Sequence, residues 1–135
     1  MLALCRKHGI HVTAHSPLGG RLVTQVPLNR DTPGPLEDPI VRSVAEKKEV
    51  TPSDILLKWA LGRGASVIPK SYTGVHMISN LQVLERPRLS EDDMEVVNKL
   101  RAGKQDVRYM DPSQYWGFDI FNEEKDEPCL EALVI

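Results

Sequence analysis

The chain has 135 residues, of which 41% are hydrophobic and 27% are charged, a composition typical of one globular domain. The formal net charge of -2 argues against a general attraction to nucleic acid or to anionic membranes. Two cysteines are too few for a disulfide framework, and no segment is apolar enough to be a signal peptide or a membrane span. We therefore expect a soluble, cytoplasmic protein with free thiols and no nucleic-acid or membrane partner.

The first part of the chain predicts a short helix, a strand and a long loop. Residues 2–8 predict the end of a helix that stops at Gly9, where a left-handed C-cap costs little. The sequence opens inside this helix without a cap, so we expect that upstream sequence is missing. Residues 10–15 are rich in β-branched side chains and end before Pro17, which favours a strand. Prolines and glycines interrupt residues 16–36, which predicts a functional or mobile loop.

The middle of the chain predicts two helices and a second strand. Apolar side chains at helical spacing predict a helix over residues 37–50. The run Thr51-Pro52-Ser53-Asp54 is a strong start for the next helix, which continues through residues 55–61. Residues 65–68 form a short apolar run that ends at Pro69, which predicts a short, buried strand.

The last part predicts a loop that turns into a helix over residues 71–81, a helix that begins at Ser90, and no regular structure from Ala102 onward. Residues 122–135 include an acidic stretch, which predicts a disordered tail. Strands that alternate with helices predict an α/β fold with parallel pairing. Because two strands cannot close a barrel or cover both edges of a sheet, we expect this α/β domain to be incomplete.

The most informative run follows the second predicted strand. Lys70 supplies a point charge, while Ser71, Thr73 and the backbone N–H groups of the next helix supply hydrogen-bond donors. His76 and Asn80 would lie one and two turns along that helix. Because α/β proteins bind ligands at the carboxyl ends of their strands, the pattern predicts a site for an anionic phosphate. On spacing alone, a strand that ends beside a surface lysine is the commoner explanation.

A second candidate site follows the first predicted strand, in the run His15-Ser16-Pro17-Leu18-Gly19-Gly20. The imidazole of His15 could stack on a planar ring, and Ser16 could bond a diphosphate. The two glycines would let the backbone approach a ligand closely. A tight turn into the loop is the alternative, and taken alone it is the commoner one.

Other kinds of site find little support. Cys5, His8, His11 and His15 would point in different directions and fit no common zinc pattern, so we predict no metal site. The sequence has no Gly-x-Ser-x-Gly elbow, and no Gly-x-Gly-x-x-Gly follows a strand.

Several blocks of the sequence, in order and at matching spacing, resemble the aldo-keto reductases. They are Gly9-Ile10-His11-Val12-Thr13-Ala14-His15-Ser16-Pro17-Leu18-Gly19, Val67-Ile68-Pro69-Lys70-Ser71, Asn80-Leu81-Gln82-Val83-Leu84 and Leu89-Ser90-Glu91-Asp92-Asp93-Met94. Within that family, His15 with Gly19-Gly20 and the run Tyr115-Trp116-Gly117-Phe118-Asp119-Ile120 resemble plant aldose-6-phosphate reductases. Those enzymes interconvert a sugar phosphate and its alditol phosphate, such as sorbitol 6-phosphate, with NADPH.

The resemblance implies an α/β fold of a particular kind, the TIM (β/α)8 barrel. Residues 1–121 would be its C-terminal part, with the strands near residues 12 and 67 as the seventh and eighth of the barrel. The loops that follow these two strands are a frequent phosphate site in such barrels.

The resemblance also implies that NADP is the cofactor. Lys70, Ser71 and Thr73 would hold the adenosine 2′-phosphate, and Asn80 would lie near the adenine. His15 would stack on the nicotinamide ring. Ser16 and Leu18 would contact the pyrophosphate. His76 stands where NADP-dependent members commonly carry an arginine, and a neutral imidazole offers less charge than a guanidinium. Ser79 likewise replaces a usual glutamate.

The resemblance places catalysis outside this chain. The family's catalytic Asp, Tyr, Lys and His come from earlier strands and loops; there, nicotinamide gives hydride to a carbonyl carbon while the tyrosine protonates the oxygen. We therefore predict no catalytic residue here and a truncated oxidoreductase that is inactive alone. The alternative is a non-catalytic nucleotide-binding or protein-interaction module that self-associates through open strand edges. Residues 10–15 carry little that would blunt an edge, which favours the truncated reductase.

Overall fold

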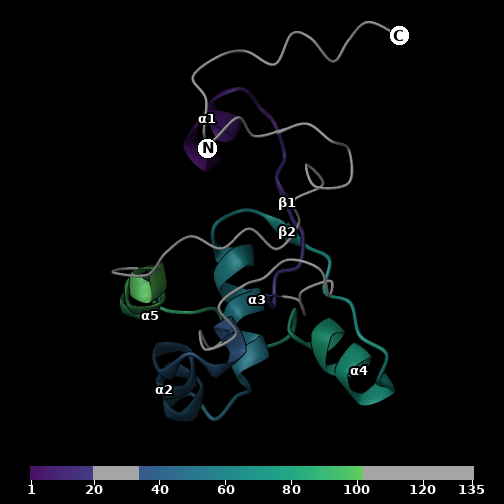
Figure 1. Ribbon diagram of the computed structural model, residues 1–135. Helices are drawn as coiled ribbons and strands as arrows, with labels where there is room; N and C mark the ends of the chain where they lie inside the picture. Colours follow the sequence, from purple (N-terminus) through teal and green to yellow (C-terminus); the bar gives the residue numbers. More distant parts are fainter. Residues whose placement is uncertain (20–33, 102–135) are drawn as a thin grey trace, which may run out of the picture.

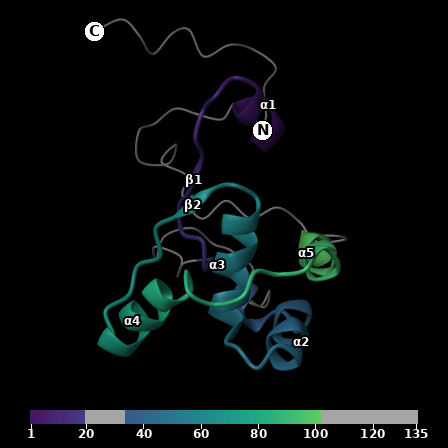
Figure 2. The same ribbon diagram turned by 180° about the vertical axis from the view of Figure 1, so that it is seen from behind.

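The computed structural model describes residues 1–19 and 34–101 (Figure 1). The elements in these ranges are α1 (Leu2–Lys7), β1 (Thr13–Ala14), the 3-10 helix η1 (Pro35–Glu37), α2 (Pro39–Lys47), α3 (Pro52–Gly62), β2 (Ser66–Val67), α4 (Gly74–Gln82), α5 (Glu91–Asn98) and the 3-10 helix η2 (Lys99–Arg101). Figures 1 and 2 show α1 on one side of the two strands and the other four α-helices on the opposite side. The order of helices and strands agrees with the predicted α/β organisation.

The two strands form a parallel pair, as the sequence predicts. Thr13 pairs with Ser66, and Ala14 pairs with Val67. The N–H group of Ser66 also donates to the carbonyl oxygen of Val12 at 3.0 Å. Because the strands are parallel and in register, the residues that follow β1 and β2 leave the pair at the same edge.

Both strands are shorter than predicted. The predicted strand over residues 10–15 is reduced to Thr13–Ala14, and the one over residues 65–68 is reduced to Ser66–Val67. A parallel ladder is only as long as its shorter partner, and β2 lies between Gly64, at a φ of +78°, and a proline that has no N–H group to donate. The second strand is also less buried than predicted, since Ile68 is 54% exposed.

The main apolar core lies between α2, α3 and α5. Its buried members are all aliphatic: Val41, Val44, Ala45, Ile55, Leu56 and Val97. In α2 the buried positions recur every three to four residues, which is the spacing of one helix face. We call this group the three-helix core.

Polar side chains fix where these helices begin. Thr51 and Asp54 form a capping box at the start of α3, and Ser90 and Asp93 form one at the start of α5. The carboxylate of Asp38 accepts a hydrogen bond from the backbone N–H of Ile40 at 2.9 Å. The predicted helix over residues 37–50 therefore begins two residues late, because Asp38 caps it and Pro39 occupies its first turn.

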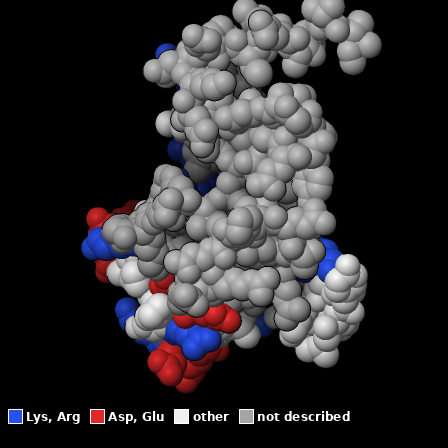
Figure 3. All heavy atoms as spheres, viewed as in Figure 1, with Lys and Arg blue, Asp and Glu red and all other residues white. Residues whose placement is uncertain are grey.

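Helix α4 contrasts with the three-helix core, since it buries none of its residues. Its large apolar side chains are mostly exposed: Val75, Met77, Ile78 and Leu81. Figure 3 shows this helix as a surface of uncharged atoms. Where the structure is described, it thus presents an apolar face that no other element covers.

Several predictions fall outside the described residues: most of the predicted loop over residues 16–36, the domain end at residue 121 and the acidic tail over residues 122–135. Within the described ranges, no helix is long and apolar enough to cross a membrane.

Candidate functional site

The parallel pairing brings the two predicted binding runs to one edge of the strand pair. His15 and Ser16 follow β1 directly, and Lys70 and Ser71 follow β2 after a short link. In α/β proteins this carboxyl edge is where ligands bind. The fold therefore gathers residues that are 55 positions apart in the sequence. We call this region the strand edge.

Lys70 carries the only full charge among the predicted binding residues. Its ammonium group lies over the ring of Tyr72, which is 89% exposed. The hydrogen bond from Lys70 and the positive charge of Lys70 both lower the pKa of the Tyr72 hydroxyl. Lys70 and Tyr72 both lie at the turn that leads into α4, and both side chains are accessible to a ligand.

Ser71 organises the start of α4. Its hydroxyl oxygen accepts a hydrogen bond from the backbone N–H of Thr73 at 3.1 Å, and the hydroxyl donates to the carbonyl oxygen of Thr73 at 3.3 Å. Thr73 is the N-cap residue of α4, but its side chain makes no capping hydrogen bond. The N–H groups of the first turn are thus left without a side-chain cap in the described structure, which suits an anion.

His76 and Asn80 lie four residues apart on α4, so they share one face of the helix. His76 is exposed and Asn80 is partly exposed. The structure therefore brings Lys70, Ser71, Thr73, His76 and Asn80 onto one turn and the helix that follows it.

The run after β1 forms a tight turn. The N–H of Gly19 donates to the carbonyl oxygen of Ser16 at 2.8 Å, and Ser16 adopts a φ of +49°. A hydrogen bond of 2.9 Å joins the Ser16 hydroxyl to Nδ1 of His15, which leaves the ring exposed. The side chain of Leu18 packs against the three-helix core and is partly buried.

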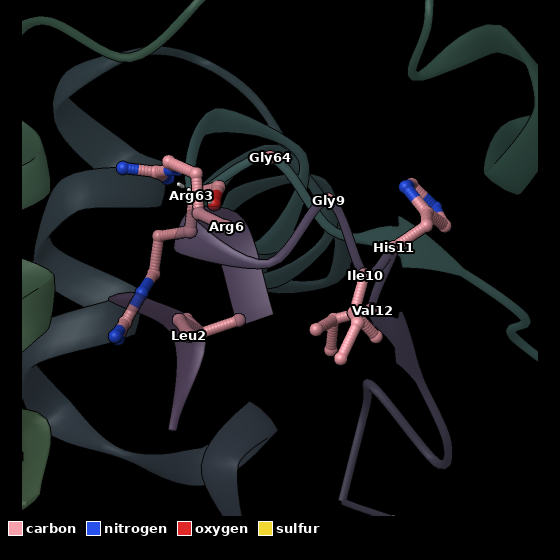
Figure 4. A pocket seen from close by; sticks show the side chains of 8 residues that line it. All are labelled: Leu2, Arg6, Gly9, Ile10, His11, Val12, Arg63 and Gly64. Atoms are coloured by element: carbon pink, nitrogen blue, oxygen red, sulfur yellow. Dashed lines mark hydrogen bonds between the residues drawn. The ribbon is translucent and has the colours of Figure 1, made fainter. Parts of the chain in front are cut away.

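Two features escaped the sequence analysis. At the opposite end of the strands, a hollow of about 250 Å³ lies between Arg6, Arg63 and the segment before β1 (Figure 4). Nη2 of Arg6 donates to the carbonyl oxygen of Arg63 at 3.1 Å and so fastens α1 to the chain before β2. This hollow lies at the amino ends of the strands, where conserved features of barrels serve stability rather than chemistry.

The second missed feature is a polar network on the strand pair itself. Oγ of Ser66 lies 2.9 Å from Nε2 of His11 and 2.9 Å from Oγ1 of Thr13. The spacing of His11 and Thr13 indicates that their side chains lie on the same face of the strand, because residues two apart on a strand point the same way. Their partner on β2 could not be identified without the register.

Among the residues that the structure describes, no three His, Cys, Asp or Glu side chains lie close enough to hold a metal ion. The chemistry available at the strand edge is therefore that of a cation, hydroxyls, an imidazole, an amide and a helix N-terminus.

Comparison with known proteins gives a consistent family. The aldo/keto reductase family model matches residues 1–102. The NADP-dependent D-sorbitol-6-phosphate dehydrogenase of Malus domestica is 36% identical over 126 residues, which cover 90% of this chain and 37% of that protein. The glycerol 2-dehydrogenase (NADP(+)) of Hypocrea jecorina is 32% identical over 125 residues, or 93% of this chain and 37% of that protein.

A solved structure agrees with these relatives. The aldose reductase from Giardia lamblia superposes with a TM-score of 0.71 at 32% identity, over 89% of this chain and 38% of that chain. The chain thus spans little more than a third of the length of the curated relatives given above, at 37%. The family resemblance that the sequence predicts is confirmed, and the similarity to a sorbitol-6-phosphate dehydrogenase agrees with the predicted subfamily. From the family match over residues 1–102, together with these relatives, the chain belongs to the aldo/keto reductase family.

Proposed function

We propose that this chain forms the seventh and eighth strand units of an aldo-keto reductase barrel and binds the phosphate end of NADPH at its strand edge. The observation that carries the proposal is the turn from β2 into α4, where Lys70 and an uncapped helix N-terminus lie together. A cation beside free N–H groups is suited to a phosphate ester. The NADP dependence named for two relatives supports the same cofactor.

In this proposal Lys70, Ser71 and Thr73 bind the adenosine 2′-phosphate. Asn80 lies beside the adenine. His76 contacts the phosphate, and its imidazole attracts the phosphate less strongly than a guanidinium would. The shared face of His76 and Asn80 on α4 supports this arrangement. An imidazole at position 76 predicts a smaller preference for NADPH over NADH than an arginine at that position would give.

The residues after β1 complete the nucleotide site. The exposed ring of His15 stacks on the nicotinamide, while Ser16 and the backbone of Leu18 contact the pyrophosphate. The tight turn at Ser16 supports this role, because it holds His15 at the strand edge. In full-length family members, bound NADPH would supply a hydride to a carbonyl carbon, and the catalytic tyrosine from another strand unit would protonate the oxygen to give an alcohol.

The substrate that we propose for the whole enzyme is a sugar phosphate, reduced as by an aldose-6-phosphate reductase. The support is the similarity to the sorbitol-6-phosphate dehydrogenase of Malus domestica. We further propose that the 135-residue chain is inactive alone, because the family's catalytic Asp, Tyr, Lys and His belong to other strand units. The cytoplasm, where NADPH is available, is the proposed location.

A calorimetric titration of the purified 135-residue chain with NADPH and NADH, run beside a carbonyl-reduction assay, tests this proposal. We expect saturable binding that favours NADPH and no turnover. Absence of binding to either nucleotide would contradict the phosphate site, whereas turnover by a homogeneous preparation would contradict the proposed inactivity. NADH binding as tight as NADPH binding would contradict the assignment of Lys70 to the 2′-phosphate.

A second candidate function is that of a protein-interaction module. The observation that favours it is that, among the described residues, large apolar side chains of α4 are exposed and no third strand pairs with β1 or β2. The occupant that we infer is a second copy of the chain, which would pair through the open strand edges. Sedimentation velocity over a range of concentrations tests this function: a monomer at all concentrations would exclude it, and a reversible dimer would support it.

A further inference from the structure

A second group of cations lines a groove of about 160 Å³ between α3 and the segment that joins α4 to α5. Its charged lining residues are Lys48, Asp54, Lys58, Arg86 and Arg88. None of them belongs to the strand edge. The groove therefore holds four positive charges and one negative charge that the proposed nucleotide site does not use.

Two of these cations are neutralised by carboxylates. Arg86 Nη1 lies 3.2 Å from Oδ2 of Asp54, and this oxygen also accepts two hydrogen bonds from Thr51. Lys48 Nζ lies 2.7 Å from Oδ2 of Asp93. In the part of the chain that the structure describes, Lys58 and Arg88 have no carboxylate at ion-pair distance, so two positive charges of the groove remain uncompensated.

Two donors in the groove also lack adequate acceptors. Lys58 is only 9% exposed, and its ammonium group reaches only the carbonyl oxygen of Leu84 at 3.5 Å, which is long for a hydrogen bond. Nε of Arg86 is buried and has no hydrogen-bond partner among the described residues. Buried charged groups are normally paired, and buried donors are normally satisfied, so this pattern calls for an acceptor that the described residues do not provide.

We propose that this groove is a second anion site and that its ligand is a phosphate group. A phosphate carries up to two negative charges, which matches the two uncompensated cations, and it has several acceptor oxygens for Lys58, Arg88 and Nε of Arg86. A carboxylate would balance only one of the two charges. Asp54 does not repel the ligand strongly, because its charge is compensated by Arg86 and its oxygen is occupied by donors.

The test is a titration of the full 135-residue chain with inorganic phosphate and with glycerol 3-phosphate, followed by two-dimensional NMR of the backbone amides. We expect saturable shifts for the backbone amides of Lys58, Arg86, Arg88 and Leu89. Arg88→Gln, at an exposed position, should weaken binding roughly tenfold, and Lys58→Met should do the same while keeping the packing of its methylene chain. Arg42→Gln, which removes an exposed charge from α2, is the matched control and should change the affinity less than about twofold.

The outcomes separate the groove from the strand edge. Groove binding that survives both Lys70→Ala and saturating NADPH supports the proposal, and tighter binding of glycerol 3-phosphate would assign the groove to a phosphate ester rather than free phosphate. Loss of the shifts in Lys70→Ala but not in Arg88→Gln would overturn it, because the strand edge would then be the phosphate site. Equal weakening by Arg42→Gln, or shifts that never saturate, would also overturn it, since both indicate diffuse attraction.

Discussion

The three-helix core and the strand edge with α4 differ in how they are held together. In the core, α2, α3 and α5 bury aliphatic side chains against one another, and both capping boxes belong to this region. At the strand edge, the proposed nucleotide-binding residues lie on or beside two short strands and helix α4. This helix has no side-chain cap and buries none of its residues.

This difference indicates that the residues that stabilise the fold and the residues proposed to bind the nucleotide lie in different parts of the chain. Ligand-binding elements are commonly drawn from the less stable parts of a protein, because they must respond to the ligand. The apolar area of α4 contributes little to stability while it stays in water. We therefore expect substitutions in the core to change stability, and substitutions at the strand edge to change binding.

The largest expected effect comes from one substitution made in both regions. Leu56, in the three-helix core, is 4% exposed, whereas Leu81, on α4, is 70% exposed. Leu56→Ala should lower the free energy of unfolding by about 3 kcal/mol, because it removes buried methyl groups and leaves a cavity. Leu81→Ala should change it by less than about 0.5 kcal/mol. Urea unfolding followed by circular dichroism measures both; equal losses would mean that α4 is packed in solution.

The second-largest expected effect is a loss of stability of the three-helix core in acid. Burial raises the pKa of Asp93, but hydrogen bonds from Lys48 and Ser90, with the charge of Lys48, outweigh burial and lower it from 3.8 to about 2. Because the folded-state pKa is lowered, the stabilisation is complete above pH 3.8 and is lost as the pH falls through 2. This loss corresponds to about 2 kcal/mol.

Urea unfolding at several pH values between 5 and 2 measures this contribution. Asp93→Asn should remove this part of the acid dependence and also lower the stability at pH 5. Asp92→Asn, an exposed neighbour on the same helical turn, is the matched control and should keep the wild-type profile. An unchanged profile in Asp93→Asn would show that other groups carry the acid dependence.

At the strand edge the expected effect is on binding. Lys70→Ala should weaken NADPH binding roughly tenfold, because it removes a charge-assisted contact, and His15→Ala should weaken it less, because it removes one stacking face. Lys7→Ala, at an exposed position of α1, serves as the charge control. Calorimetry measures all three; equal losses in Lys70→Ala and His15→Ala would contradict the assignment of the charge to the phosphate.

The smallest expected difference concerns two threonines at helix starts. Thr51 accepts a capping hydrogen bond from the N–H of Asp54, whereas the side chain of Thr73 makes no such bond. Thr51→Ala should therefore cost about 1 kcal/mol of stability in the absence of nucleotide, and Thr73→Ala only a few tenths. Thermal unfolding of the two variants compares them directly, and an equal decrease in melting temperature would remove the distinction between the two helix starts.

Local signals in the sequence predicted the helices well, and they predicted the turn that leads into α4. Thr51 followed by Pro52 marks the start of α3, and Lys70 before a helix marks the candidate site, because these effects act within one turn of chain. The length of the strands could not be predicted in this way. It depends on which residues of β1 and β2 pair, and residues 10–15 contain no sign of where their partner ends.

Most of the features that the sequence analysis missed depend on contacts between distant residues. Lys58 and Arg88 are 30 positions apart, and each is ordinary as a single surface or helix residue. The packing of Leu18 on the three-helix core joins residues far apart in the sequence, and its predicted contact with the pyrophosphate stays a prediction. Asp38 was overlooked as a cap because the apolar pattern of α2 does not show where the helix begins.

Amide hydrogen exchange of the full chain, with and without NADPH, tests the separation of core and site most directly. We predict that amides in α3 are protected in the absence of nucleotide, and that amides in the first turn of α4 exchange rapidly and become protected when NADPH is added. Protection of α4 equal to that of α3 without nucleotide, or no change in α4 on adding saturating NADPH, would contradict the account.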